Sequence, residues 1–136
     1  MRLYLACKMS GLPQFNFPAF YAASADLRSR GYDIVSPAEL DDEQTKADAM
    51  ASANGNPQDA QRTWGDFLAR DVKIVSDQVE GIVFLPDWVQ SRGAKLEAFV
   101  NLLCKDHKFF QYHGPDEEIE SLSRGFVLHQ IYMDML

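Results

Sequence analysis

The sequence predicts a single α/β domain with a mainly parallel sheet of four or five strands and helices on both faces. Short apolar runs alternate along the chain with segments of helical period, which is the pattern of βαβ units. These runs show little polar alternation, as expected of parallel strands that are buried on both faces. With 136 residues, 46% of them hydrophobic, and no compositional break, the chain is long enough for one core and too short for two. We therefore expect one domain over residues 1–136.

The charge of the chain limits the partners that it can bind. Thirteen basic residues against 20 acidic ones give a formal net charge of −7. Binding to polymeric nucleic acid or to an anionic membrane needs clustered Lys and Arg, so neither is an expected partner. The two cysteines, Cys7 and Cys104, stand in apolar settings, and the sequence shows neither a signal peptide nor an apolar run of about 18 residues. We expect a cytoplasmic protein with reduced thiols.

The first part of the chain reads as strand, loop, helix and strand. The apolar runs that predict buried strands lie at residues 2–7, 32–36, 81–86 and 108–112. After a loop at residues 8–13, Asn16 is placed to cap a helix that has Pro18 in its first turn and Gly31 at its end. The polar stretch 41–62 has no clear period, and we expect a long loop or lid there, with room for a short helix.

The end of the chain is expected to be a turn, a helix and an apolar tail. Gly114 and Pro115 predict the turn, and a helix is expected to begin near Asp116. Residues 126–136 are apolar enough to pack on the domain or on a partner subunit.

A carboxylate interrupts the apolar face of the helix predicted over residues 63–76. Thr63 is a suitable cap for this helix, and Asp66 stands three residues later, as in a capping box. The inward stripe consists of Phe67, Leu68, Ile74 and Val75. Asp71 lies in the middle of that stripe. Because a buried charge costs free energy unless it is paired, Asp71 is kept there either by an ion pair, with Arg70 or Arg92, or by a function.

The stretch 87–97 predicts an anion site and a second buried carboxylate. It follows a strand and leads into an apolar helix, so it lies at the carboxyl end of the sheet, where open α/β folds bind ligands. If the helix begins near Ser91, its free N–H groups, the Ser91 hydroxyl and the Arg92 guanidinium converge on a place suited to phosphate, although Ser91 is equally well explained as a plain cap. Glu97 comes about two turns later. Its neighbours on the helix face carry no charge: Gly93, Ala94, Val100 and Asn101. A solvated glutamate would more often have Lys or Arg there, so Glu97 is expected to face a pocket.

In this topology the candidate residues meet at one edge of the sheet. Tyr4, the loop at residues 8–11, Asp71 and the stretch 91–97 all reach the carboxyl edge, although a tyrosine in a first strand is more often an ordinary core residue. Paired carboxylates at the anomeric carbon of a sugar are the minimum for glycosidic chemistry, with one as nucleophile and one managing protons. For a retaining path we expect the carboxyl groups of Asp71 and Glu97 about 5 to 6 Å apart, or somewhat more if Asp71 contacts the base instead.

Several motifs resemble the nucleoside 2-deoxyribosyltransferase-like superfamily, especially its small phage and bacterial branch. They are YLACKMSGLP at residues 4–13, NFPAF at 16–20, SPAE at 36–39, the Asp71 helix, and WVQSRGAKLE at 88–97. The likeness covers roughly residues 2–112. It implies a flavodoxin-like three-layer fold in which Glu97 attacks C1′, Asp71 assists at the sugar or base, and Tyr4 orients Glu97.

One position separates two activities within this superfamily. Transferases that act on free nucleosides tend to have an aspartate six residues before the nucleophile, whereas the related nucleoside 5′-monophosphate N-glycosidases have a serine that binds phosphate. This chain has Ser91 there, and the neighbouring Arg92 adds a charge suited to phosphate. In the first loop, Cys7 and Lys8 replace the Gly and Pro that are common in relatives, and Lys8 can meet an anion. The substrate-binding residues that we expect are Ser91, Arg92, Gly93, Lys8, Ser10 and Gly11.

The resemblance thus implies cleavage of the N-glycosidic bond of a (deoxy)nucleoside 5′-monophosphate, with release or exchange of the base. Two alternatives remain open: a transferase acting on free nucleosides, and a nucleotide-binding or sensing module that does no catalysis. The enzyme is favoured because both carboxylates and Tyr4 occur together.

No cofactor is expected, and a second copy of the chain is the expected partner. The histidines at positions 107, 113 and 129 show no metal-ligand spacing with the cysteines, so we assign no metal. Relatives complete their sites across a subunit interface, and the tail at residues 126–136 is apolar. We therefore expect a homodimer or a higher homo-oligomer.

Overall fold

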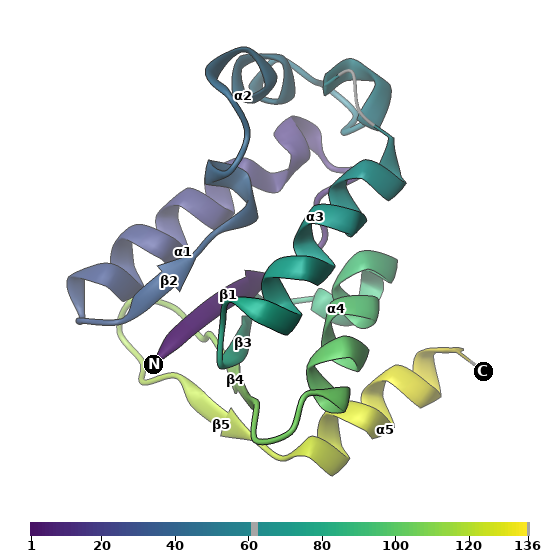
Figure 1. Ribbon diagram of the computed structural model, residues 1–136. Coiled ribbons are helices and arrows are strands. Elements are labelled where there is room, and N and C mark those ends of the chain that lie inside the picture. Colours follow the sequence, from purple (N-terminus) through teal and green to yellow (C-terminus); the bar gives the residue numbers. More distant parts are fainter. Residues whose placement is uncertain (61–62, 136) are drawn as a thin grey trace.

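A computed structural model describes residues 1–60 and 63–135 and shows one sheet with helices on both faces (Figure 1). The strands are β1 (Arg2–Ala6), β2 (Asp33–Val35), β3 (Gly81–Phe84), β4 (Lys108–Gln111) and β5 (Glu120–Leu122). Their order across the sheet is β2-β1-β3-β4-β5. The first four are parallel, and β5 is antiparallel to β4. This is the strand order of flavodoxin-like folds, so the predicted mainly parallel α/β architecture is confirmed.

Side chains that alternate along the strands divide the core between the two helical layers. The helices are α1 (Phe17–Ser29), α2 (Glu43–Met50), α3 (Trp64–Asp77), α4 (Arg92–Leu103) and α5 (Arg124–Met135). Leu3 and Leu5 of β1 face the layer of α1, where they join a cluster with Phe20. Tyr4 lies between them in sequence and faces the opposite layer, with Val75 of α3 and Ala98 of α4. The alternation of side chains along β1 therefore directs Tyr4 toward α3 and α4.

The two helices that carry the candidate carboxylates begin as predicted. At the start of α3, the Thr63 side chain accepts from the Asp66 N–H and the Asp66 carboxylate accepts from the Thr63 N–H, which completes the capping box. At the start of α4, the Ser91 hydroxyl oxygen accepts from the Ala94 N–H at 3.0 Å. These caps fix where each helix begins and hence which residues face inward.

Two predictions about helix starts are wrong. Asn16 does not cap α1: its backbone is left-handed, with φ of 60°, and its side-chain amide donates to the Lys8 carbonyl at 3.0 Å. No helix begins near Asp116; residues 115–117 form a turn and a bend, and α5 begins at Arg124. Between the turn and α5, the strand β5 pairs antiparallel with β4. The chain reverses at Gly114, and β5 covers the edge of β4 that would otherwise be open.

The polar stretch 41–62 contains the expected short helix, α2, and residues 61–62 of it lie outside the described part. The stretch packs on the loop at residues 8–13, where the Gly11 N–H donates to the Gly55 carbonyl at 2.7 Å. Gly55 has φ of +67°, and a Cβ there would lie 2.2 Å from the backbone oxygen of Leu12. The close approach requires glycine at position 55, where the stretch packs against the loop.

Two further observations concern the cysteines and the apolar character of the helices. Cys7 and Cys104 are free thiols. Within the described ranges 1–60 and 63–135, none of the helices has both the length and the apolar character needed to cross a membrane.

Candidate active site

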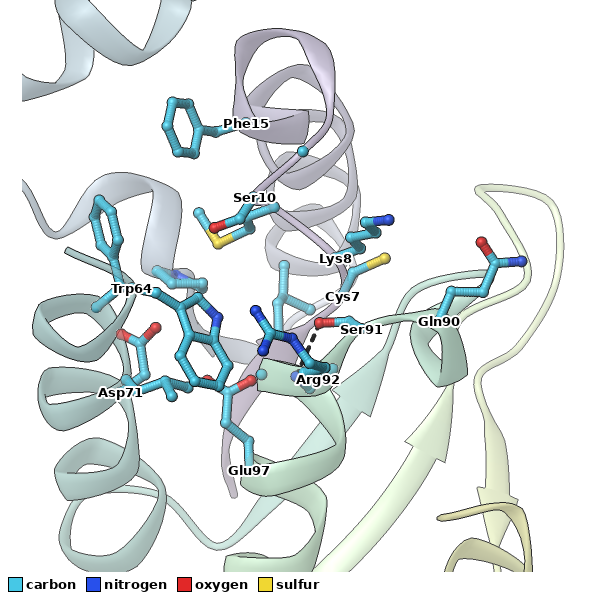
Figure 2. Close-up of a pocket in the computed structure, with 18 of the residues that line it drawn as sticks. Cys7, Lys8, Ser10, Phe15, Trp64, Asp71, Gln90, Ser91, Arg92 and Glu97 are labelled. Carbon is cyan, nitrogen blue, oxygen red and sulfur yellow. Dashed lines mark hydrogen bonds between the residues drawn. The ribbon is translucent and has the colours of Figure 1, made fainter. Parts of the chain in front are cut away.

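A cavity of about 340 Å³ lies at the carboxyl end of β1, against α3 and the start of α4 (Figure 2). This volume is in the range of small-molecule binding sites. All of the candidate site residues line it: Tyr4, Lys8, Ser10, Gly11, Asp71, Ser91, Arg92, Gly93 and Glu97. The structure thus brings together residues from one strand, one loop and two helices that are up to 93 positions apart.

Glu97 is buried and hydrogen-bonded by the tyrosine of β1. The Tyr4 hydroxyl donates to Glu97 Oε2 at 2.5 Å, and the two residues are 1% and 4% exposed. Burial raises the pKa of Glu97 well above its ordinary value, and the negative charge of Asp71 raises it further. The Tyr4 hydrogen bond and the charge of Arg70 both lower this pKa. Burial also raises the pKa of Tyr4 well above its ordinary value, so Tyr4 remains a neutral donor.

Asp71 is the second buried carboxylate, and it has a cationic partner. Arg70 Nε donates to Asp71 Oδ1 at 2.9 Å, so Arg70, not Arg92, is the partner of the two arginines considered. Burial raises the pKa of Asp71, while the Arg70 guanidinium acts in the opposite direction. The ion pair explains how the charge is tolerated. Because Asp71 also lines the cavity, the pair leaves this carboxylate available to a ligand.

The two carboxylates act on each other across the cavity. Figure 2 shows the side chains of Asp71 and Glu97 projecting from α3 and α4 into the same space. Each is at most 5% exposed, and the charge of Asp71 raises the pKa of Glu97. Two neighbouring carboxylates in a site of low dielectric do not both ionise readily, so the pair tends to hold a proton. Such a pair can supply one nucleophile or base and one acid.

The start of α4 forms a cationic end of the cavity. The Ser91 hydroxyl accepts from the Ala94 N–H, which leaves its own O–H free to donate. The first N–H groups of the helix, those of Arg92 and Gly93, have no partner within the helix. The Arg92 guanidinium lies 4.3 Å from the centroid of the Trp64 ring, and Lys8 lines the same cavity. Together these groups can receive an anion such as phosphate.

Trp64 is the functional candidate that the sequence analysis missed. It is the first residue of α3, and its ring lies under the Arg92 guanidinium at the cavity. The signal was present, because Trp64 stands two turns before Asp71 and four residues before Leu68, on the same stripe of the helix. Cys7 also lines the cavity, but burial raises the pKa of its thiol to about 11, so it is not a nucleophile at neutral pH.

The family match covers the part of the chain that builds this site. A family model described as "Domain of unknown function (DUF4406)" matches residues 1–107, from before β1 to beyond α4. Comparisons with curated proteins and with solved structures found no match. The matched range contains every residue that lines the cavity and more than half of the chain. The chain therefore belongs to the family Domain of unknown function (DUF4406).

Proposed function

We propose that this protein cleaves the N-glycosidic bond of a (deoxy)nucleoside 5′-monophosphate and releases or exchanges the base. The observation that carries the proposal is a buried Glu97, hydrogen-bonded by Tyr4, in one cavity with Asp71. The resemblance of the motifs to the nucleoside 2-deoxyribosyltransferase-like superfamily supports the same reaction. A retaining glycosidic mechanism needs two carboxyl groups in these roles.

Glu97 is the nucleophile in this mechanism. Its carboxylate forms a bond to C1′ while the bond from C1′ to the base nitrogen breaks, and the electron pair leaves with the base, which takes up a proton. Water or a second base then attacks C1′ and releases Glu97. Only the ionised carboxylate attacks, and the two groups that lower the pKa of Glu97 are Tyr4 and Arg70. Activity should therefore rise with pH through the pKa of Glu97.

Asp71 assists at the sugar or at the base. Burial raises its pKa, so a fraction of Asp71 is protonated at higher pH than an exposed aspartate and can give its proton to the leaving base. In its ionised form it can accept a hydrogen bond from a sugar hydroxyl. Its carboxyl group is held by Arg70 in either role.

The 5′-phosphate is placed at the start of α4. Ser91 and Arg92 supply a hydroxyl and a guanidinium, and the helix end adds its partial positive charge. A free nucleoside has no group that needs this cationic end. For this reason the monophosphate is the proposed substrate in place of the nucleoside.

A second copy of the chain is the proposed partner. Among the described residues, large apolar side chains of α4 and α5 are exposed: Leu96, Phe99, Leu103, Phe126, Leu128, Tyr132, Met133 and Met135. The two helices pack against each other, so these side chains come from one region of the surface. An apolar surface of this kind is typical of an interface between subunits.

The proposal is tested by incubating the protein with a panel of ribo- and deoxyribonucleotides and nucleosides and measuring free base by chromatography. Glu97→Ala should abolish base release and leave nucleotide binding largely intact, because the nucleophile acts mainly in the transition state. Glu118→Ala is the matched control, since Glu118 is an exposed glutamate that does not line the cavity. Unchanged base release by Glu97→Ala would contradict the mechanism. Nucleotide binding without base release from any substrate would favour the binding module, and a preference for nucleosides would favour the transferase.

A further inference from the structure

Arg70 connects the carboxylate pocket to the segment of residues 37–41, of which Pro37 lines the cavity and Asp41 does not. Its Nε donates to Asp71 Oδ1 at 2.9 Å, and its Nη1 donates to Asp41 Oδ1 at 2.7 Å. Its Nη2 lies 3.4 Å from the carbonyl oxygen of Pro37. Asp41 is 29 residues earlier in the chain, after the 3-10 helix Pro37–Glu39 and before α2. One guanidinium therefore joins the Asp71 carboxylate of α3 to the Asp41 carboxylate and the Pro37 carbonyl of the segment 37–41.

Among the described residues, Arg70 is the ion-pair partner of the Asp41 carboxylate. The Asp41 side chain is 5% exposed in the ion pair, and its Oδ2 has no hydrogen-bond partner among the residues that the structure describes. A buried carboxylate with one oxygen unpaired is costly, so its pairing with a cation needs to offset that cost. Asp41 does not line the cavity, and it thus has no direct access to a ligand there.

We propose that Arg70 and Asp41 are positioning residues of the carboxylate pocket: Asp41 holds the Arg70 guanidinium, and Arg70 holds Asp71 at the cavity wall. The pocket is then complete only when the segment around Asp41 is docked on α3. A catalytic consequence of these positioning roles rests on the proposed function. The arrangement itself is testable without any substrate.

The charges around Asp71 give the expected direction of each perturbation. The groups that act on its pKa come from three places: Arg70 on α3, Asp41 before α2 and Tyr4 on β1. Asp71 in turn raises the pKa of Glu97 on α4. The cation Arg70 lowers the pKa of both Asp71 and Glu97, whereas the anion Asp41 raises the pKa of Asp71. Loss of the cation should therefore leave both pocket carboxyls protonated to higher pH. Loss of the Asp41 charge has two opposed effects on Asp71, because it removes an anion that raises the Asp71 pKa and loosens the cation that lowers it. The pKa of Glu97 is lowered by Arg70 and not shifted directly by Asp41, so Glu97 reports whether Asp41 holds the guanidinium in place.

The experiment is a titration of the side-chain carboxyl groups by carbon NMR in the whole 136-residue chain, which requires no activity. In Arg70→Gln the midpoints of Asp71 and Glu97 should move to higher pH, and in Arg70→Lys, which keeps the charge, the Glu97 midpoint should stay near that of the wild type. In Asp41→Asn, which removes the charge that holds the guanidinium, the Glu97 midpoint should move to higher pH, by less than in Arg70→Gln. If Arg70→Gln does not fold, Asp41→Asn and Arg70→Lys carry the test.

The matched control is Glu39→Gln. Glu39 belongs to the same segment and pairs with Arg28 at 2.6 Å, away from the cavity, so both midpoints should stay in place. An unmoved Glu97 midpoint in Asp41→Asn would overturn the proposal, as would equal shifts in Glu39→Gln. In an active protein, the acid limb of kcat/KM should move to higher pH in Arg70→Gln. Shifted midpoints in a protein that releases no base would support the positioning roles of Arg70 and Asp41 and refute the proposed function. Base release with unmoved midpoints would refute the positioning roles alone.

Discussion

Tyr4→Phe removes one hydroxyl from the centre of the pocket and should cost more stability at high pH than at low pH. The lost group is the donor to Glu97 Oε2 at 2.5 Å, and neither residue is exposed enough for water to replace it. A hydrogen bond to a charged group contributes about 1.5 to 3 kcal/mol, and one to a neutral group about 0.5 to 1.5 kcal/mol. The cost of the substitution thus depends on whether Glu97 is ionised.

The direction of the pH dependence follows from the pKa of Glu97. The Tyr4 hydrogen bond lowers this pKa, so Tyr4→Phe raises it further above its value in the unfolded chain. When a carboxyl group has a raised pKa in the folded state, the protein loses stability as pH rises through that pKa. Tyr4→Phe should therefore lower the free energy of unfolding by the amount of a neutral hydrogen bond at acidic pH, and by the larger amount of a charged one at alkaline pH.

Urea unfolding of the wild type and of Tyr4→Phe, from mildly acidic to mildly alkaline pH, measures this difference. Tyr132→Phe is the control, because Tyr132 is 59% exposed and away from the cavity. A cost that is the same at every pH would refute the reasoning that Tyr4 stabilises the charged form of Glu97. So would a cost below about 0.5 kcal/mol, which is less than a neutral hydrogen bond contributes.

Four further outcomes are expected. Arg92→Ala should raise KM for the monophosphate by roughly one to two decades, for a lost contact of about 1.5 to 3 kcal/mol, and should leave activity on nucleosides unchanged in steady-state kinetics. Glu97→Gln should raise the free energy of unfolding in urea at alkaline pH, because it removes a buried charge whose pKa is raised, and the gain should shrink as pH falls. Gly55→Ala should lower the free energy of unfolding by at least about 2 kcal/mol in urea, because its Cβ would meet backbone atoms of Leu12. The wild type should sediment as a dimer or larger at micromolar concentration, and Leu103→Lys should weaken that association; a monomeric wild type would contradict the proposed assembly.

The sequence alone predicted the architecture because its signals are local. The four parallel strands are apolar runs, and the caps at Thr63 and Ser91 lie within three residues of the groups that they bind. Asp71 stood out because it interrupts an apolar stripe, and Glu97 because its helix neighbours carry no charge. A periodic pattern with a single break identifies the residue that breaks it, and both of these residues line the cavity.

The features that the sequence did not predict depend on contacts between distant segments. Nothing near Asp41 indicates that it pairs with an arginine 29 positions later. Asn16 has the composition of a cap, but its side chain bonds the Lys8 carbonyl in the preceding loop. The strand β5 is only three residues long and is defined by its pairing with β4. Local preference for a turn or a helix is weak, and tertiary contacts decide such cases.

The alternation of side chains in β1 makes stability and chemistry inseparable in this strand. Leu3 and Leu5 belong to one core cluster, and Tyr4 between them belongs to the other and contacts Glu97. Deleting Leu5 would exchange the faces of the residues before it, placing the phenol of Tyr4 under α1 and Leu3 in the pocket. Such a change would damage both layers at once, and no repacking of one layer could restore it. Variation in this strand is therefore confined to substitutions that keep its length.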